Sequence, residues 1–132
     1  MSEFHTTYTV PISGASLSSG QTTTSKWIPV ATADTINLWY YNNTTASPTL
    51  TITADITIFP CKDENTAPTI PITGGNNYKN VTYTTGGTTT GAWVHVDTPA
   101  ELLTYPVMWM RINVSSASAA SLVYVAVAKN GW

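Results

Sequence analysis

A histidine and an aspartate lie two residues apart in the segment WVHVD, residues 93–97. In an extended strand this spacing places His95 and Asp97 on the same face. A His–Asp pair can act in general base catalysis, which also requires a nucleophile or a substrate beside it. The sequence contains no GxSxG, HExxH, CxxC or P-loop motif. We therefore predict a hydrogen-bonded surface pair and no catalytic site here.

Asp55 is the second acidic candidate, because it interrupts a threonine face in the segment TLTITADITIF, residues 49–59. A glycosidase would need a second carboxyl group about 5 to 10 Å away in a cleft. No residue pattern identifies such a partner. We predict that Asp55 is a solvated or hydrogen-bonded charge that blocks pairing at a sheet edge, and that the protein is not an enzyme.

Metal ligands are sparse. Asp63, Glu64 and Asn65 carry oxygen atoms of the kind that Ca²⁺ prefers, but they lack the regular alternation of calcium-binding loops. Cys61 is the single cysteine, which excludes an internal disulfide and a cysteine-based zinc site. It is expected to be a small buried residue at the end of a strand. We expect no metal and no cofactor.

The aromatic residues form a candidate binding site of another kind. The chain has five tryptophans and seven tyrosines, and Trp39 and Tyr41 share one face of a predicted strand. Sugar rings stack on aromatic side chains, and Asn37, Asn42 and Asn43 nearby would supply hydrogen bonds. Tyrosine and tryptophan are also enriched in subunit interfaces. These rings therefore either fill a core or an interface, or bind sugar.

The elements that must position these residues are β-strands, because apolar residues recur at every second position and helical spacing is nearly absent. A capping-box pattern, TPAE at residues 98–101, predicts one or two helical turns over residues 99–105. Eight strands separated by turn-rich segments predict a single all-β domain over residues 1–132, an antiparallel β-sandwich or jelly roll. The predicted strands cover residues 6–12, 26–31, 35–42, 49–59, 78–84, 92–97, 106–114 and 122–129, with a short extended piece at 69–72.

Two of the predicted strands, VMWMRINV and LVYVAVA, are apolar on both faces. A sheet of a two-layer sandwich normally has one wet face, so the second apolar face predicts a cover, which is either a loop or a neighbouring subunit. We expect an interface that contains Trp109, Arg111, Val123, Val125 and Val127. There Arg111 would pair with a carboxylate or a backbone carbonyl at the rim of the contact.

Composition restricts the classes of partner. Charged residues make up 9% of the chain, against roughly 25% in an average soluble domain. The net charge of −2 and the lack of a basic stripe argue against nucleic-acid binding. No apolar run approaches the length of a membrane-spanning helix. An uncharged threonine face and a low charge suit a surface that meets other subunits.

The order of the segments SGASLSSG, KWIPV, TTGGTTTG and PAELLTYPVMWMRINV, followed by a last apolar strand ending in KNGW, resembles small β-sandwich virion proteins of tailed bacteriophages. The resemblance covers most of the chain and lies in style and order. It implies a homotrimer or other homo-oligomer bound to a major capsid protein or another virion protein. Such a protein would lie on the outer surface of the virion, and in the host cytoplasm during assembly.

Two functions are expected from these observations. The first is a virion structural protein, above all a capsid decoration or accessory protein on the outer surface of a phage head. The alternative is a carbohydrate-binding adhesion module of a phage tail or fibre. The two differ in what the aromatic residues contact, which is a protein neighbour in the first and a glycan in the second.

Overall fold

A computed structural model describes residues 5–30, 35–42, 49–68, 78–83, 92–96, 107, 109–117 and 120–131. All regular elements in this part of the chain are strands, and they agree with the all-β prediction. Their bounds are β1 (His5–Leu17), β2 (Thr22–Thr24), β3 (Ile28–Pro29), β4 (Thr35–Asn42), β5 (Leu50–Thr57), β6 (Lys79–Tyr83), β7 (Trp93–Val96), β8 (Trp109–Ser116) and β9 (Ala120–Gly131). The predicted helical turn at 99–105 and the extended piece at 69–72 lie outside the described residues.

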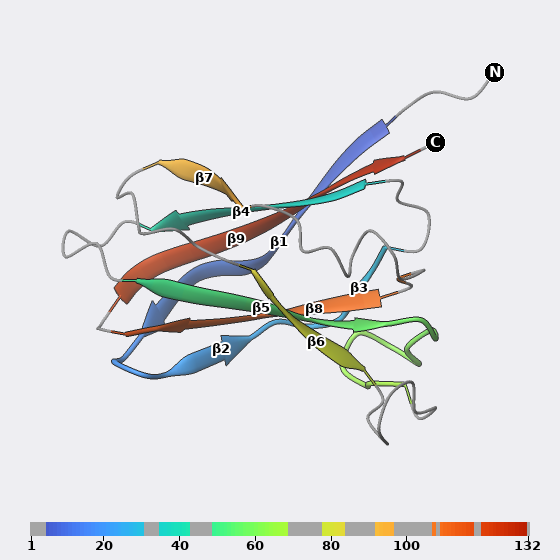
Figure 1. Cartoon of the computed structure of the whole chain (residues 1–132), viewed down its shortest axis with the longest axis horizontal. Helices are drawn as coiled ribbons and strands as arrows, with labels where there is room; N and C mark the ends of the chain where they lie inside the picture. Colours follow the sequence, from blue (N-terminus) through green and yellow to red (C-terminus); the bar gives the residue numbers. More distant parts are fainter. Residues whose placement is uncertain are drawn as a thin grey trace.

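The strands form two antiparallel sheets that face each other (Figure 1). Sheet A has the order β1-β9-β4-β7. Sheet B has the order β2-β8-β5-β6, and the short β3 pairs with β8 as well. This arrangement confirms the predicted antiparallel β-sandwich. It also places β9 and β4 inside sheet A and β8 and β5 inside sheet B, so each of these four strands has a neighbour on both edges.

Alternation along the central strands builds the core between the sheets. On β8, Met110, Ile112 and Val114 point inward and are fully buried, while the residues between them are partly exposed. Complete burial of a side chain of this size contributes about 1.5 to 3 kcal/mol relative to exposure. The inward positions of β5 and β9 complete one continuous cluster with those of β8.

Val123, Val125 and Val127, which were predicted to lie in a subunit interface, belong instead to this core. All three valines have 0% exposure and face sheet B, where no neighbouring subunit can contact them. The opposite face of β9 carries Ala126 and Ala128, which are small and lie between strands with larger side chains. At Ala126 and Ala128 the second apolar face of β9 is therefore covered within this chain, and these two positions provide no argument for assembly.

Strand β1 runs farther than the predicted residues 6–12 and continues through the segment SGAS, whose composition is typical of a turn. Its pairing with β9 shifts register three times, between Thr9 and Leu17, which marks β-bulges that bend a long strand. Gly14 has a φ of 69° within this stretch, a conformation that glycine adopts without strain. A long bulged strand therefore replaces the predicted strand and turn.

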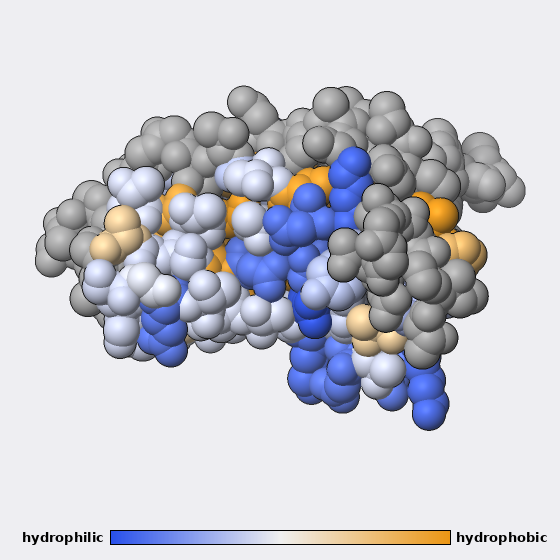
Figure 2. Space-filling model, turned by 60° about the horizontal axis from the view of Figure 1, so that its bottom comes forward, coloured by the Kyte–Doolittle hydropathy of each residue, from blue (hydrophilic) through white to orange (hydrophobic). Residues whose placement is uncertain are grey.

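The outer face of sheet B explains the threonine pattern of β5. Asn113 on β8 accepts a hydrogen bond from Thr24 Oγ1 at 2.8 Å and donates one to Thr53 Oγ1 at 3.2 Å. Neutral polar side chains therefore link β2, β8 and β5 across the sheet. Figure 2 shows this side of the molecule as a largely hydrophilic surface. The threonine face is a hydrogen-bonded polar layer over the sheet, exposed at Thr51 and buried at Thr57.

Candidate ligand-binding site

The outer face of sheet A carries a group of aromatic side chains, here called the aromatic cluster. It consists of Trp39 and Tyr41 on β4, Trp93 and His95 on β7, and Tyr124 on β9. Strand order brings them together, because β4 pairs with β7 on one side and with β9 on the other. Residues directly opposite each other in such pairs have Cβ atoms about 4.5 to 5.5 Å apart on the same face. The inward residues of β4 fill the core instead.

Three rings of the cluster enclose a hollow, here called the aromatic cup. The ring centroids of Tyr41 and Trp93 are 5.6 Å apart, and those of Tyr41 and Tyr124 are 5.7 Å apart. Trp93 and Tyr124 close the triangle at 6.3 Å. The planes are inclined by 48° to 75°, and the hollow that the three residues line has a volume of about 280 Å³. Trp93 is 46% exposed, so a ligand can reach its ring from solvent.

A polar pair lies next to Trp39, farther along β4 and β7 than the cup. The rings of Trp39 and His95 have centroids 4.9 Å apart, and His95 Nε2 lies 3.2 Å from Asn37 Oδ1. Because Asn37, Trp39 and Tyr41 alternate along β4, all three line one face of the strand. Within the part of the chain that the structure describes, the His95 ring therefore forms a hydrogen bond with Asn37 on the neighbouring strand β4. Asp97, predicted to pair with His95, lies outside the described residues.

Gly14 provides the space behind one wall of the cup. A methyl group at this position would lie 3.4 Å from the hydroxyl oxygen of Tyr124. The positive φ of Gly14 would in addition strain any other residue there. The glycine in the bulged strand β1 therefore allows the close approach of β1 to the Tyr124 side chain.

The sequence identified half of this site. It nominated Asn37, Trp39 and Tyr41, which the structure brings to one face, and whether they bind a ligand stays a prediction. It did not identify Trp93 and Tyr124, which form two of the three walls of the cup. Both are aromatic residues at outward positions of their strands, and this is the sequence feature from which they could have been predicted as site residues. Their proximity to Tyr41 depends on strand order and register, which no local pattern contains.

Arg111, predicted to pair across a subunit interface, is instead paired within the chain. Its Nη2 and Nε lie 2.8 and 3.0 Å from Oδ2 of Asp55. Asn80 and Asn113 donate to the two oxygens of the same carboxylate at 2.8 and 3.1 Å. Asp55 is 3% exposed and belongs to a strand with a neighbour on both sides, so it does not block an edge. The predicted hydrogen bonding of Asp55 is confirmed, and its predicted place at an edge is wrong.

Two aromatic rings hold the Arg111 side chain in place. Its guanidinium carbon is 4.7 Å from the centroid of the Trp27 ring and 5.1 Å from that of Tyr78, within the range of a cation–π contact. The guanidinium is thus engaged by one carboxylate and two rings of its own chain. Trp109, on the same outer face of sheet B, is partly exposed, and its part in an interface stays a prediction.

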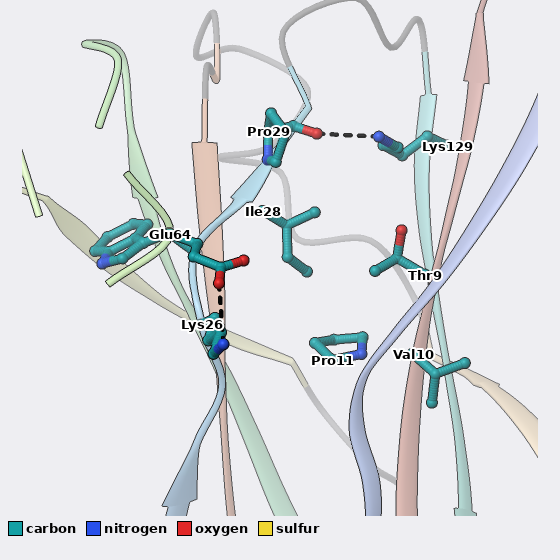
Figure 3. Close-up of a pocket in the computed structure, with 9 residues that line it drawn as sticks. Thr9, Val10, Pro11, Lys26, Ile28, Pro29, Glu64 and Lys129 are labelled. Carbon is teal, nitrogen blue, oxygen red and sulfur yellow. Dashed lines mark hydrogen bonds and ion pairs between the residues drawn. The ribbon is translucent and has the colours of Figure 1, made fainter. Parts of the chain in front are cut away.

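A second hollow, of about 420 Å³, lies where the edge of sheet A meets β3 of sheet B (Figure 3). Lys26 Nζ is 2.9 Å from Glu64 Oε1, and Lys129 Nζ donates to the carbonyl oxygen of Pro29 at 3.0 Å. Each of these charged groups therefore has a partner within the chain. The hollow is lined by Thr9, Val10, Pro11, Lys26, Trp27, Ile28, Pro29, Glu64 and Lys129.

The acidic segment after β5 forms a tight turn. Asp63 Oδ1 accepts a hydrogen bond from the backbone N–H of Asn65 at 2.9 Å, and a β-bridge joins Asp63 to Thr66. Hydrogen bonds from the backbone of Asn65 and from the side chain of Thr66 lower the pKa of the Asp63 carboxyl, the Asn65 bond most strongly. Among the described residues, no three histidine, cysteine, aspartate or glutamate side chains come close enough to hold a metal ion. No helix in the same part of the chain is long and apolar enough to span a membrane.

Cys61 is expected to be chemically inert in the folded protein. It is buried, and desolvation raises the pKa of its thiol to about 11, although Arg111 acts in the opposite direction. The reactive species is the thiolate, and an exposed cysteine has a pKa of about 8.5. Alkylation by iodoacetamide at about pH 8 should therefore be about a hundredfold slower in buffer than in denaturant. Equal rates would show that the thiol is not shielded as described.

Comparison of the chain with protein-family models, with curated protein sequences and with solved structures found no match.

Proposed function

We propose that this protein binds carbohydrate through the aromatic cluster on the outer face of sheet A. The observation that carries the proposal is the cup formed by Tyr41, Trp93 and Tyr124, which is concave and open to solvent. The C–H groups of a sugar ring pack on aromatic faces, and its hydroxyl groups need hydrogen-bonding partners at the edge. His95, two residues from Trp93 on β7, can supply one such partner.

The position of the aromatic cluster supports binding over a structural role. The core of the sandwich is already filled by the inward positions of both sheets. The cluster lies on the opposite side of sheet A, where its apolar surface is in contact with water. Concentrated apolar surface on a folded domain commonly marks a binding site. In the setting that the phage resemblance implies, the protein would act as an adhesion module of a tail or fibre.

The second candidate is a virion structural protein, a capsid decoration or accessory protein on a phage head. The charged fraction of 9% favours it, because few charges would have to be desolvated when this surface meets a neighbour. In this case the aromatic cluster would dock on a major capsid protein, as tyrosine and tryptophan do in protein interfaces. Because Ala126 and Ala128 of β9 are covered within this chain, β9 does not support this candidate. Its support is the low charged fraction and the resemblance to virion proteins.

A glycan array tests the first candidate. The intact protein should bind at least one glycan, and Trp39→Ala should weaken that binding by about 1 kcal/mol, or roughly fivefold, the scale of one aromatic contact. Trp39 is chosen because its ring packs on His95 outside the cup and is not part of the core. Absence of any binding by the intact protein would contradict the proposal.

Light scattering and cosedimentation test the second candidate. A decoration protein should form a homotrimer or another homo-oligomer larger than the single 14.2 kDa chain, and should sediment with empty capsids. A monomer that does not bind capsids would contradict this candidate and leave carbohydrate binding in place.

A further inference from the structure

Among the residues that the structure describes, no lysine or arginine lines the cup. Lys26, Lys62, Lys79 and Arg111, four of the five basic residues in the sequence, belong to strands of sheet B or to the segments beside them. The fifth, Lys129, lies on β9 five residues from Tyr124, which is about 16 Å along a strand. Its amino group is bound to the carbonyl oxygen of Pro29, on the side of sheet B (Figure 3).

The chemistry of the cup walls disfavours anions. The face of an aromatic ring carries the negative part of its quadrupole, so a ring face gives a carboxylate no favourable electrostatic contact. An anion entering the cup would also lose hydration without gaining a basic partner, and unpaired burial of a charge is costly. His95, two residues from Trp93 on β7, can form a hydrogen bond with a sugar hydroxyl group.

The size and shape of the cup limit the ligand further. A hollow of about 280 Å³ is at the small end of ligand sites. The hollow is shallow, and its three rings contact one another and are inclined by 48° to 75°, so one sugar ring can lie over them but not between them.

Resting on the carbohydrate-binding function proposed above, we infer that the cup takes a single uncharged pyranose residue and discriminates against uronic and sialic acids. The sugar ring packs against Tyr41, Trp93 and Tyr124, and a hydroxyl group on the β7 side faces His95, two residues from Trp93. Uncharged hexosides are thus the class of ligand that the cup binds. Carboxylated sugars of the same stereochemistry are the class that it excludes.

Matched pairs of glycosides test this inference. Methyl β-glucoside and methyl β-glucuronide differ only in oxidation at C6, and the corresponding galactoside and galacturonide form a second pair. Their affinities can be measured by titration NMR, at about pH 8, where imidazole side chains are ordinarily neutral. In the pair whose stereochemistry fits, the uncharged member should bind at least about tenfold more tightly than the uronide. Raising the salt concentration should not change the affinity of the uncharged member.

The outcomes separate this inference from the proposal on which it rests. If the uronide binds as tightly as its uncharged partner and Trp93→Ala removes the binding, carbohydrate binding stands and the inference fails. The inference also fails if every glycan bound on an array carries a carboxylate or a sulfate. If the intact protein binds none of the four glycosides and no glycan on the array, both the proposed function and the inference are contradicted.

Discussion

Trp93→Ala is expected to weaken glycan binding by about tenfold or more, the largest effect on affinity of any single substitution in the aromatic cluster. The Trp93 ring forms one wall of the cup and contacts both other walls, with centroid distances of 5.6 Å to Tyr41 and 6.3 Å to Tyr124. Its loss removes one stacking surface and releases the two rings that it holds, each contact being worth about 0.5 to 1.5 kcal/mol. Isothermal titration with the glycan of highest affinity measures the change.

Tyr8→Ala is the matched control for this substitution. Tyr8 is also a large exposed aromatic residue of sheet A, at 68% exposure, but it lies on β1 and does not line the cup. Its removal should leave the affinity unchanged. Neither substitution should lower the free energy of unfolding by more than about 1 kcal/mol, because neither side chain belongs to the core. Equal losses of affinity in the two variants would show that the cup is not the binding site.

Asp55→Ala is expected to lower the free energy of unfolding by about 3 to 5 kcal/mol, the usual cost of removing one partner of a buried ion pair. The substitution leaves the guanidinium of Arg111 without its carboxylate. It also removes the acceptor for the amide groups of Asn80 and Asn113. Because β5 and β8 are adjacent strands inside sheet B, this defect lies within the sheet and not at its edge. Urea denaturation followed by tryptophan fluorescence measures the loss.

Glu64→Ala is the control, because it removes a carboxylate from an exposed ion pair and leaves the buried pair of Asp55 and Arg111 intact. Glu64 forms an ion pair of similar length with Lys26, 2.9 Å, but the two side chains are 55% and 66% exposed. Exposed pairs contribute about 0 to 1 kcal/mol, and the backbone carbonyl of Glu64, which accepts from the N–H of Trp27, is retained in the variant. A loss in Asp55→Ala no larger than that in Glu64→Ala would contradict the structural role assigned to Asp55.

The parts of the fold that the sequence predicted well are those in which one face is apolar and the other polar. The predicted strand at residues 35–42 has the bounds of β4, and the alternation from Leu50 to Ile56 places the apolar side chains of β5 in the core. A period of two residues specifies both the strand and its buried face, so no tertiary information is needed. The sandwich follows from many such strands with turns between them.

The errors occur where the local pattern is compatible with two structures. β9 is apolar on both faces, and alternation cannot distinguish the valines that meet the core from the alanines that lie under neighbouring side chains. The segment around Gly14 has turn composition but continues a bulged strand, because β9 pairs with it at Ile12, Ala15 and Leu17. The contact of Tyr41 with Trp93 and Tyr124 depends on the strand order β7-β4-β9, which is a property of the whole sheet.

The most direct test of glycan binding at the outer face of sheet A is ¹⁹F NMR of protein labelled with 5-fluorotryptophan. Single tryptophan substitutions assign the signals. Trp39 and Trp93 report on the aromatic cluster, whereas Trp27 and Trp109 report on sheet B and the segments beside it. Titration with a bound glycan should shift the signals of Trp93 and Trp39 saturably and leave those of Trp27 and Trp109 in place. Shifts confined to Trp27 and Trp109 would contradict the assignment of the aromatic cluster as the carbohydrate-binding site.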